Sequence, residues 1–279
     1  MRIVPVITMI LAVALGSLTP AVTLASNFSS LEGDPHLRSA SALVIDIDGN
    51  VIYGKDIDTI RPIASITKLM MAMVIIDSGV DLQEKITVTR DDRDLVQLTG
   101  SRLEYGATLT RKQMILLAIM SSENRAAAAL GRTFPGGMKQ FVTQMNAKAA
   151  ELGMRHSRFA DPAGLNVENM STASDLAKMV AAAYGYPLIR QASTTRRLEV
   201  YPYAGRGPLT YGNTNRLLKN ESWDIALSKT GYINEAGRCL VMQANIEGES
   251  VSIVLLNSFG KLTPFGDSNR LRKWMLAQK

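Results

Sequence analysis

The sequence is poor in cysteine and histidine, with one and two residues of these types among 279. The lone cysteine, Cys239, excludes an internal disulfide framework and a thiolate-rich metal site. The two histidines, His36 and His156, are too few for a histidine-based metal cluster. Aromatic residues are also scarce, at 6%, but 46% of the residues are apolar. This composition excludes extensive disorder and fits one large globular domain or two closely joined subdomains.

The chain lacks a strong excess of either charge. Lys and Arg number 31 against 25 Asp and Glu, which gives a net charge of +6. A nucleic-acid binder concentrates Lys and Arg in a patch interleaved with aromatic residues. The densest basic groups here, Arg196-Arg197 and Arg270–Lys273, are short and are typical of a solvated face. We therefore expect no nucleic-acid partner, whereas a modest positive charge suits an anionic polymer such as cell-wall material.

Long apolar runs are missing except at the N-terminus. Residues 3–24 are apolar, follow the single charge of Arg2 and end in Thr23-Leu24-Ala25, a small-residue cleavage pattern. We predict a signal peptide over residues 1–25 that is cleaved on export to the periplasm. The alternative is an uncleaved membrane anchor, because the run is about long enough to span a bilayer. Interruptions by two prolines and one glycine favour cleavage.

The patterning of the remaining chain predicts an α+β fold. Strand-like segments occur near both ends and form two hairpins around tight turns, at 41–47 with 51–54 and at 238–246 with 250–256. Helical patterns fill the middle and close the chain, at 65–77, 113–132 with an interruption at 121–124, 138–152, 172–184 and 267–277. Terminal segments that share one sheet, with a mostly helical middle inserted, give this order.

A serine and a lysine stand one helical turn apart at the predicted start of the first helix. Ser65 and Lys68 occupy positions i and i+3, which face the same way with Cβ atoms about 5–6 Å apart. A serine is a poor nucleophile unless a neighbouring base takes its proton. Lysine acts as that base only when neutral, and lowering its pKa from about 10.4 to near 8 needs roughly 3 kcal/mol of burial or like-charge repulsion.

The Ser-x-x-Lys pattern alone is weak, because it also occurs at Ser258 and Lys261. That second copy follows a strand and contains glycine, so no helix holds its side chains together. Lys261 is either a ligand for a substrate carboxylate or a solvated surface lysine. The alternative for the first copy is that Ser65 is a simple helix cap beside a solvated Lys68.

Two further strings strengthen the chemical interpretation. Ser122-Glu123-Asn124 interrupts an Ala-rich helical stretch, where a turn would direct a hydroxyl and an amide into a cleft. Lys229-Thr230-Gly231 precedes a strand-like segment, and its glycine permits close approach of a substrate backbone. The charge of Lys229 would also depress the pKa of Lys68. Each string taken alone also fits a surface turn.

Together these strings resemble the serine penicillin-binding proteins and β-lactamases, whose signature is Ser-x-x-Lys, then Ser-x-Asn, then Lys-Thr-Gly. The similarity is greatest to the D-alanyl-D-alanine peptidases, and among these to the short endopeptidases. The similarity extends over about residues 36–279. It rests on the segments around the three motifs and on two more: Ala64–Met70, Met120–Ala127, Asp161–Leu165, Thr172–Ala177 and Ser228–Gly237.

The resemblance implies a β-lactamase-like fold, in which an antiparallel sheet flanked by helices carries an inserted all-helical lobe. Residues 26–279 would form a single catalytic domain, with the sheet subdomain at about 36–85 and 200–279 and the helical lobe at about 86–199. The active site would lie between the two parts.

The resemblance also implies roles for eight residues. Ser65 would be the acylated nucleophile, Lys68 its proton acceptor and Ser122 a proton relay. The backbone N–H groups of Ser65 and Tyr232 would form the oxyanion hole. The substrate would be bound by five residues of the motifs: Asn124, Lys229, Thr230, Gly231 and Tyr232. The resemblance implies no metal or cofactor.

Several activities fit these motifs. The leading one is a D-alanyl-D-alanine endopeptidase that cuts peptidoglycan cross-links between stem peptides and is acylated by β-lactam antibiotics. The alternatives are a carboxypeptidase that trims the terminal D-alanine, a β-lactamase, and a non-catalytic receptor. A class A β-lactamase needs a loop glutamate, and no Glu-x-x-Leu-Asn string lies between Ser122 and Lys229. A Ser-His-Asp triad is not expected, because neither His36 nor His156 has a motif context.

The end of the sequence bears on localisation. The longer carboxypeptidases of this group carry an extra C-terminal β domain and an amphipathic membrane anchor. Here the sequence stops at Lys279, directly after the last predicted helix. We therefore expect an enzyme of the periplasm without a stable membrane anchor.

Overall fold

The computed structural model of the chain describes Phe28 and residues 31–277. The signal peptide predicted over residues 1–25 lies outside these described residues. Among the helices of the described part, none has both the length and the apolar content to cross a membrane.

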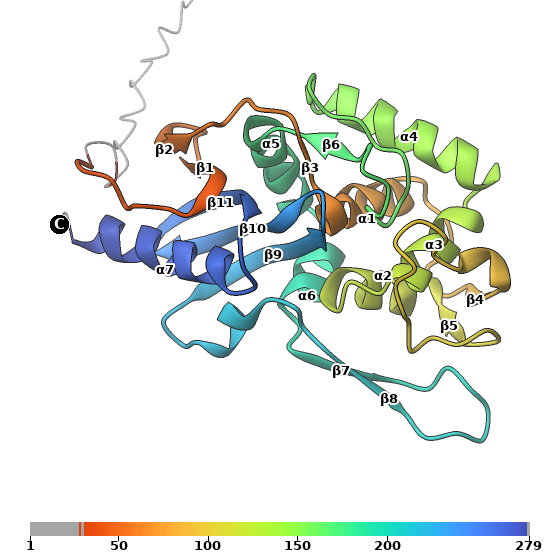
Figure 1. Ribbon diagram of the computed structural model, residues 1–279. Helices are drawn as coiled ribbons and strands as arrows, with labels where there is room; N and C mark the ends of the chain where they lie inside the picture. Colours follow the sequence, from red (N-terminus) through yellow and green to blue (C-terminus); the bar gives the residue numbers. More distant parts are fainter. Residues whose placement is uncertain (1–27, 29–30, 278–279) are drawn as a thin grey trace, which may run out of the picture.

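Five antiparallel strands form the main sheet, in the spatial order β2-β1-β11-β10-β9 (Figure 1). β1 (Ser39–Asp46) pairs with β2 (Val51–Lys55) in the predicted N-terminal hairpin and with β11 (Glu249–Ser258) on its other side. β10 (Gly237–Ile246) pairs with β11 and with β9 (Asp224–Ile233), which is an edge strand. The two ends of the chain therefore share one sheet, as the sequence predicts.

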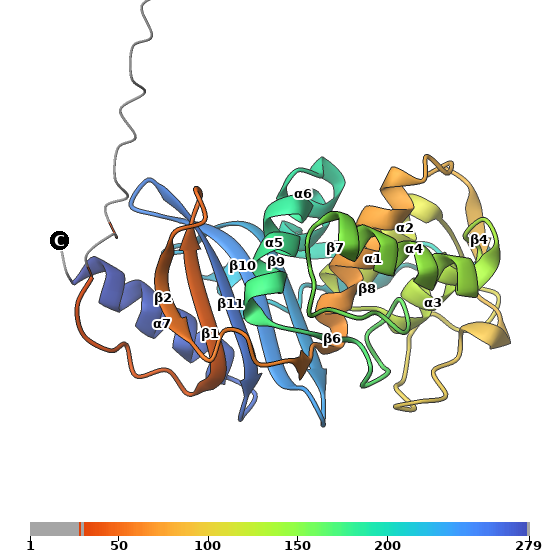
Figure 2. The ribbon, with the colours of Figure 1, turned by 90° about the horizontal axis from the view of Figure 1, so that it is seen from above.

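The strands of this sheet have an apolar side chain on each face. Along β10, Leu240 and Met242 join the core beneath α7 (Thr263–Leu276), whereas Val241 joins the larger core on the other face. That larger core includes α5 (Ala173–Tyr184), which packs against β1, β10 and β11. Figure 2 shows α7 and α5 on opposite sides of the sheet. Both faces are covered, so the middle of each central strand carries consecutive apolar residues, at 42–45, 239–242 and 253–256.

The central helix of the molecule is α1 (Thr67–Asp77), which follows the 3₁₀ turn η1 (Ala64–Ile66). Every residue of α1 from Thr67 to Ile75 is buried. A helix that is apolar on all sides belongs in an interior, and α1 packs against each of its neighbours, which are α2 (Arg111–Met120), α3 (Asn124–Arg132), α4 (Gly137–Glu151), α5 and α6 (Pro187–Thr194).

Short elements complete the fold. The described residues also form three two-stranded pairs and two 3₁₀ turns: β3 (Arg61–Pro62) with β6 (Met170–Ser171), β4 (Lys85–Thr87) with β5 (Thr108–Thr110), β7 (Arg197–Val200) with β8 (Leu209–Gly212), η2 (Arg90–Asp92) and η3 (Arg216–Lys219). The β7–β8 hairpin extends away from the body below α2 and α6 (Figure 1).

The α+β fold is confirmed, and the elements that the patterning did not predict include α6, the β7–β8 hairpin and β9. The middle of β9 is the polar run Ser228-Lys229-Thr230, so its hydrophobic pattern is broken. Ser228 and Lys229 are nevertheless buried. The sequence placed Lys229-Thr230-Gly231 before a strand, whereas these residues lie within one.

The division into a sheet subdomain and a helical lobe stays a prediction. The helix α5 bears on this division, because its residues belong to the range expected for the helical lobe, yet it packs on one face of the sheet.

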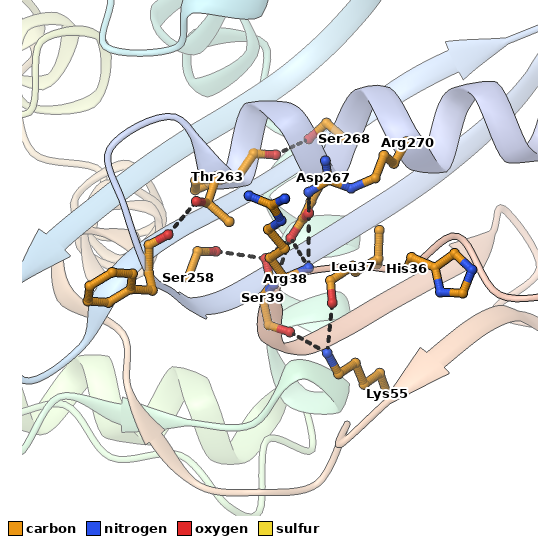
Figure 3. A network of polar contacts seen from close by, with 12 residues as sticks. His36, Leu37, Arg38, Ser39, Lys55, Ser258, Thr263, Asp267, Ser268 and Arg270 are labelled. Carbon is orange, nitrogen blue, oxygen red and sulfur yellow. Dashed lines mark hydrogen bonds and ion pairs between the residues drawn. The ribbon is translucent and has the colours of Figure 1, made fainter.

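A buried carboxylate joins the first strand to the last helix (Figure 3). Asp267 of α7 is fully buried and accepts hydrogen bonds from the backbone N–H groups of Arg38 and Ser39, at 3.1 and 2.7 Å, and from the Ser39 hydroxyl at 2.5 Å. Its other oxygen pairs with Arg270. Ser258, the last residue of β11, completes the network at 2.7 Å from the Ser39 hydroxyl. This network fixes α7 on the sheet.

Candidate active site

Ser65 and Lys68 meet where the central helix begins. Ser65 lies in η1 and Lys68 is the second residue of α1. The Lys68 Nζ atom is 2.9 Å from the Ser65 Oγ atom. The contact expected from the i,i+3 spacing is confirmed, although the helix opens as a 3₁₀ turn rather than as an α-helix at Ser65. Ser65 has no helix-cap hydrogen bond of its own to compete with this contact: its hydroxyl donates at 3.3 Å to the carbonyl of Ala163.

Burial makes Lys68 a base near neutral pH. Its side chain is completely buried, and burial lowers its pKa to about 7, against the opposing effect of the carboxylates of Asp161, Glu123 and Asp94. The sequence left burial and the like charge of Lys229 open as causes of a lowered pKa of Lys68, and burial is the main cause. The like charge acts on Lys229 instead. Burial, and to a smaller extent the charge of Lys68, hold the pKa of Lys229 well below its usual value.

The hydrogen-bond partners of Lys68 orient its lone pair. Besides Ser65, the amine contacts the Asn124 Oδ1 atom at 2.8 Å and the Ala163 carbonyl oxygen at 2.6 Å. Both of these oxygens are acceptors only. The protonated amine also donates to the Ser65 Oγ atom. A neutral amine keeps its two protons on these acceptors and directs its lone pair to Ser65, whose hydroxyl proton then turns from the Ala163 carbonyl to the amine. The arrangement suits removal of the serine proton.

The Ala163 carbonyl is held in place by the carboxylate of Asp161. One Asp161 oxygen accepts from the backbone N–H groups of Ala163 and Gly164, each at 2.6 Å. The other accepts from the Asn166 N–H and from the Asn169 side-chain amide, both at 2.7 Å. Both oxygens are occupied by their own loop, so Asp161 is a structural group and does not face Ser65 as a free base.

This loop packs directly on the residue that precedes Ser65. A Cβ atom on Gly164 would lie 1.9 Å from the Ala64 carbonyl oxygen, and Gly164 has a φ of +77°. Ala64 itself has a φ of +47°, which is unusual for a residue with a side chain. Strained backbone next to a reactive side chain is a feature of functional sites.

Ser122 and Asn124 stand on the turn between α2 and α3. Ser122 has a φ of +59°, and its Oγ atom accepts from the Lys229 Nζ atom at 3.0 Å. Asn124 begins α3, gives its carbonyl oxygen to Lys68 and donates from its Nδ2 atom to the Thr99 hydroxyl at 2.9 Å. Glu123 points the other way and accepts from Ser101 at 2.6 Å. The predicted break of the helix is confirmed, and it brings both side chains beside the lysines.

Lys229 and Thr230 approach the same turn from the edge strand β9. Lys229 is buried and also donates to the Thr230 carbonyl at 2.9 Å. The Thr230 hydroxyl donates to the Thr214 hydroxyl at 2.6 Å. The two motif residues thus alternate along β9. The Lys229 side chain is buried and contacts Ser122, whereas Thr230 faces the cleft.

Gly231 and Tyr232 continue β9 past Ser65. A Cβ atom on Gly231 would lie 2.9 Å from the Ile63 carbonyl oxygen and 3.1 Å from the Ser65 nitrogen. The glycine is therefore required for close approach of the chain's own backbone. Close approach of a substrate backbone at Gly231 stays a prediction. The Tyr232 side chain is half exposed and donates from its hydroxyl to Asn234 at 2.7 Å.

A cleft of about 710 Å³ opens above these residues. Of the eight residues singled out from the sequence, Lys68 and Lys229 are buried, each within hydrogen-bonding distance of a residue that lines the cleft. The other six line the cleft: Ser65, Ser122, Asn124, Thr230, Gly231 and Tyr232. The structure thus brings all eight together.

Neither histidine takes part in this arrangement, and Cys239 belongs to the cleft lining but directs its thiol to the Ala236 carbonyl rather than to one of the eight residues. Cys239 is buried, as predicted, and burial raises the pKa of its thiol to about 11. Neither His36, which is exposed beside Asp34, nor His156 is among the described residues that line the cleft. Within the described residues, no group of three or more His, Cys, Asp and Glu side chains is placed to hold a metal ion.

Sequence reasoning missed three contributors to the site. They are the Ala163 carbonyl, which contacts both Lys68 and Ser65, and the hydroxyls of Thr99 and Thr214. The segment around Ala163 was noted as a similarity without a role. No pattern marks the two threonines, because each acts through one contact with a residue distant in sequence.

Comparison with known proteins agrees with this geometry. The chain matches the family described as D-alanyl-D-alanine carboxypeptidase over residues 29–260. It is 44% identical over 270 residues to the D-alanyl-D-alanine endopeptidase of Escherichia coli (strain K12), covering 96% of this chain and 86% of that one. It is 46% identical over 240 residues to the D-alanyl-D-alanine endopeptidase of Pseudomonas aeruginosa, covering 86% of this chain and 77% of that one.

The fold has solved relatives as well. The crystal structure of the Streptomyces K15 DD-transpeptidase superimposes with a TM-score of 0.81 at 27% identity, covering 88% of this chain and all of that one. The match over residues 29–260 and the two relatives above 40% identity place the protein without ambiguity. The chain belongs to the D-alanyl-D-alanine carboxypeptidase family.

Proposed function

We propose that the protein is a serine D-alanyl-D-alanine endopeptidase that cleaves cross-links between peptidoglycan stem peptides through an acyl-enzyme on Ser65. The observation that carries this proposal is the 2.9 Å contact between Ser65 Oγ and the buried amine of Lys68, whose pKa is about 7. The relatives at 44% and 46% identity that are named D-alanyl-D-alanine endopeptidases support the substrate class.

Acylation begins with the neutral Lys68. Its lone pair takes the Ser65 hydroxyl proton while the Oγ atom forms a bond to the carbonyl carbon of the D-alanyl amide. The carbonyl oxygen becomes an oxyanion, for which the backbone N–H groups of Ser65 and Tyr232 are the proposed donors. Asn124 holds the substrate amide, and the Thr230 hydroxyl binds the carboxylate next to the scissile bond.

Collapse of the tetrahedral intermediate breaks the C–N bond. The leaving amine needs a proton, which Ser122 donates, since its Oγ atom accepts from Lys229 at 3.0 Å and so has its own proton free. Ser122 in turn takes up the proton that Lys68 removed from Ser65, which leaves Lys68 neutral again. The amine leaves and an ester on Ser65 remains. The neutral Lys68 then takes a proton from a water molecule as the water oxygen attacks the ester carbonyl carbon. It returns that proton to the Ser65 Oγ atom as the ester C–O bond breaks and the D-alanyl peptide leaves.

A β-lactam should arrest the enzyme at the ester. Fast hydrolysis of a penicilloyl ester by a class A β-lactamase uses a loop glutamate, and the acid of the corresponding loop, Asp161, is committed to its own backbone. We therefore propose that β-lactams are covalent inhibitors rather than substrates. A non-catalytic receptor is less favoured, because Lys68 and Ser122 are both placed for chemistry.

We further propose that the enzyme works in the periplasm after removal of residues 1–25. The apolar N-terminal sequence with its small-residue ending supports this proposal.

The proposal is tested by mass spectrometry of the protein after incubation with penicillin. We expect an added mass on Ser65 and none in Ser65→Ala. Digestion of cross-linked muropeptide dimers should yield monomers, whereas release of free D-alanine from a pentapeptide as the faster reaction would favour the carboxypeptidase. Absence of the adduct, or an adduct on another side chain, would overturn the mechanism.

A further inference from the structure

The cleft beside Ser65 is lined by positive charge only. Four cations belong to its lining, and none of the described residues that line it is an aspartate or a glutamate: the four are Arg216, Lys219, Arg238 and Lys261. They come from η3, from strand β10 and from the loop after β11. Separate parts of the chain thus deliver like charges to one cavity, which we call the basic subsite.

The basic subsite has no internal counter-charge. In the described part of the chain, no ion pair joins any of these four residues to a carboxylate. The Arg238 guanidinium stacks on the ring of Tyr232 at 3.6 Å from the ring centroid, and the other three side chains are exposed. Stacking fixes the guanidinium plane and leaves its N–H edge for an acceptor. Like charges gathered in a concave site raise the local potential for an anion.

The position of the basic subsite relates it to the leaving group. Thr230, the proposed ligand of the carboxylate next to the scissile bond, shares a hydrogen bond with Thr214, two residues before Arg216. On its other side, Tyr232 follows Thr230 by two residues and carries Arg238. Arg216 and Arg238 are thus connected to Thr230 through its neighbours Thr214 and Tyr232, and Lys219 and Lys261 line the same cleft.

We propose that the basic subsite binds the additional carboxylates of the stem peptide that departs when a cross-link is cut. This inference rests on the proposed function. A carboxypeptidase releases one D-alanine, whose single carboxylate is already assigned to Thr230. An endopeptidase releases a whole stem peptide that bears further carboxylates. Four unpaired cations in the same cleft as Thr230 match the second leaving group and give the enzyme its preference for cross-links.

The expected effect is moderate and salt-dependent. Contacts between exposed charges are individually weak, roughly twofold to fivefold each. Acting together on a multiply charged ligand, the four cations should raise kcat/KM by about tenfold or more at low salt, and this gain should shrink as ionic strength rises.

The experiment compares two cross-linked muropeptide dimers. They are identical except that the carboxylates of the leaving stem peptide, apart from the one next to the scissile bond, are free in one dimer and amidated in the other. Wild type should cleave the free-acid dimer about tenfold faster in kcat/KM. The triple variant Arg216→Gln/Lys219→Gln/Lys261→Gln should bring that ratio to about twofold or less.

The matched control is the triple variant Arg155→Gln/Lys139→Gln/Lys273→Gln. It removes the same charges from exposed positions outside the cleft lining and should keep the ratio of wild type. A ratio near one in wild type, or an unchanged ratio in the cleft variant, would overturn the basic subsite.

A binding measurement separates this inference from the catalytic proposal. Calorimetry with Ser65→Ala, which cannot be acylated, should show tighter binding of the free-acid dimer than of the amidated dimer, and the difference should vanish when the three cleft substitutions are added. Equal binding of the two dimers contradicts the basic subsite even if penicillin acylates Ser65. A failed penicillin reaction contradicts the catalytic proposal even if the binding difference is found.

Discussion

Gly164 lies against Ala64 so closely that one added carbon would clash with the backbone. A Cβ atom on Gly164 would fall 1.9 Å from the Ala64 carbonyl oxygen. The loop that carries Gly164 also supplies the Ala163 carbonyl, which contacts the amine of Lys68 at 2.6 Å. The nucleophile and its base are thus positioned by a backbone contact on one side and by a carbonyl on the other. The geometry of Ser65 depends on a residue that carries no functional group.

Gly164→Ala should therefore impair both folding and acylation. The added methyl group must push the loop away from Ala64, and the φ of +77° is unfavourable for alanine in addition. We expect a loss of about 2–4 kcal/mol in the free energy of unfolding and a fall of at least tenfold in the rate of penicillin acylation, measured by denaturant unfolding and by mass spectrometry.

Gly153→Ala is the control for the cost of the backbone conformation. Gly153 has a φ of +68° but nothing within 4 Å of the Cβ position. It should lose about 1 kcal/mol and keep the acylation rate. Equal behaviour of the two variants would mean that the contact with Ala64 has no role.

The pH dependence of acylation should follow the Lys68 amine. Only the neutral amine accepts the serine proton, and with a pKa of about 7 the neutral fraction falls as the pH drops below that value. The second-order rate constant for penicillin should therefore rise from pH 6 to a plateau near pH 8, by about tenfold. Lys68→Arg should show no such rise and should lose about 10²–10⁴-fold in rate, because an arginine stays protonated.

Glu123→Gln should move this pH profile. The carboxylate of Glu123 raises the pKa of Lys68 against the larger effect of burial. Glutamine keeps an oxygen that can accept from Ser101 and from the Arg125 N–H, as Glu123 does, but it removes the negative charge. The midpoint of the profile should shift to lower pH while the plateau rate changes little. A shift to higher pH would contradict the assigned electrostatics.

Asp161→Asn distinguishes a positioning residue from a deacylating base. The amide offers one acceptor oxygen where the carboxylate offers two, so the loop loses hydrogen bonds from its own N–H groups. We expect slower acylation by about tenfold, a loss of about 1–3 kcal/mol in stability, and an unchanged lifetime of the penicilloyl-enzyme. If acylation stayed fast and the adduct instead lived much longer than in wild type, Asp161 would be the base.

The sequence predicted those parts of the site that local patterns encode. Ser65 and Lys68 lie on one helix, where a spacing of three fixes their contact, and Ser122 with Asn124 lies on one turn. The strand carrying Lys229 was missed, because Ser228 and Lys229 fill buried positions in its middle and interrupt its apolar residues. Site chemistry overrides the hydrophobic period at that place.

Contacts between distant segments were beyond reach for a different reason. Ala163 and Lys68, which are in contact, are separated by 95 positions in the sequence, and Lys229 and Ser122 are separated by 107. The packing of the whole fold sets such distances, and no local pattern reports them. The burial that lowers the pKa of Lys68 also arises only when α1 is enclosed by the surrounding helices.

Asp267→Ala should destabilise the fold without altering the chemistry. Removal of the carboxylate leaves the buried Ser39 N–H and the Arg38 N–H without their acceptor (Figure 3), and each such loss costs about 1–3 kcal/mol. We expect a total of about 3–4 kcal/mol, seen as a fall of about 6–16 °C in Tm. Because Asp267 lies outside the cleft lining, the rate of penicillin acylation at 20 °C, well below the transition, should stay within about twofold of wild type.

Lys273→Ala, on an exposed position of the same helix, controls for the loss of a charged side chain from α7 and should leave both quantities unchanged. A variant that keeps its Tm would show that α7 is held by the apolar core beneath it alone, and a variant that keeps its Tm but loses acylation would place Asp267 in the catalytic machinery.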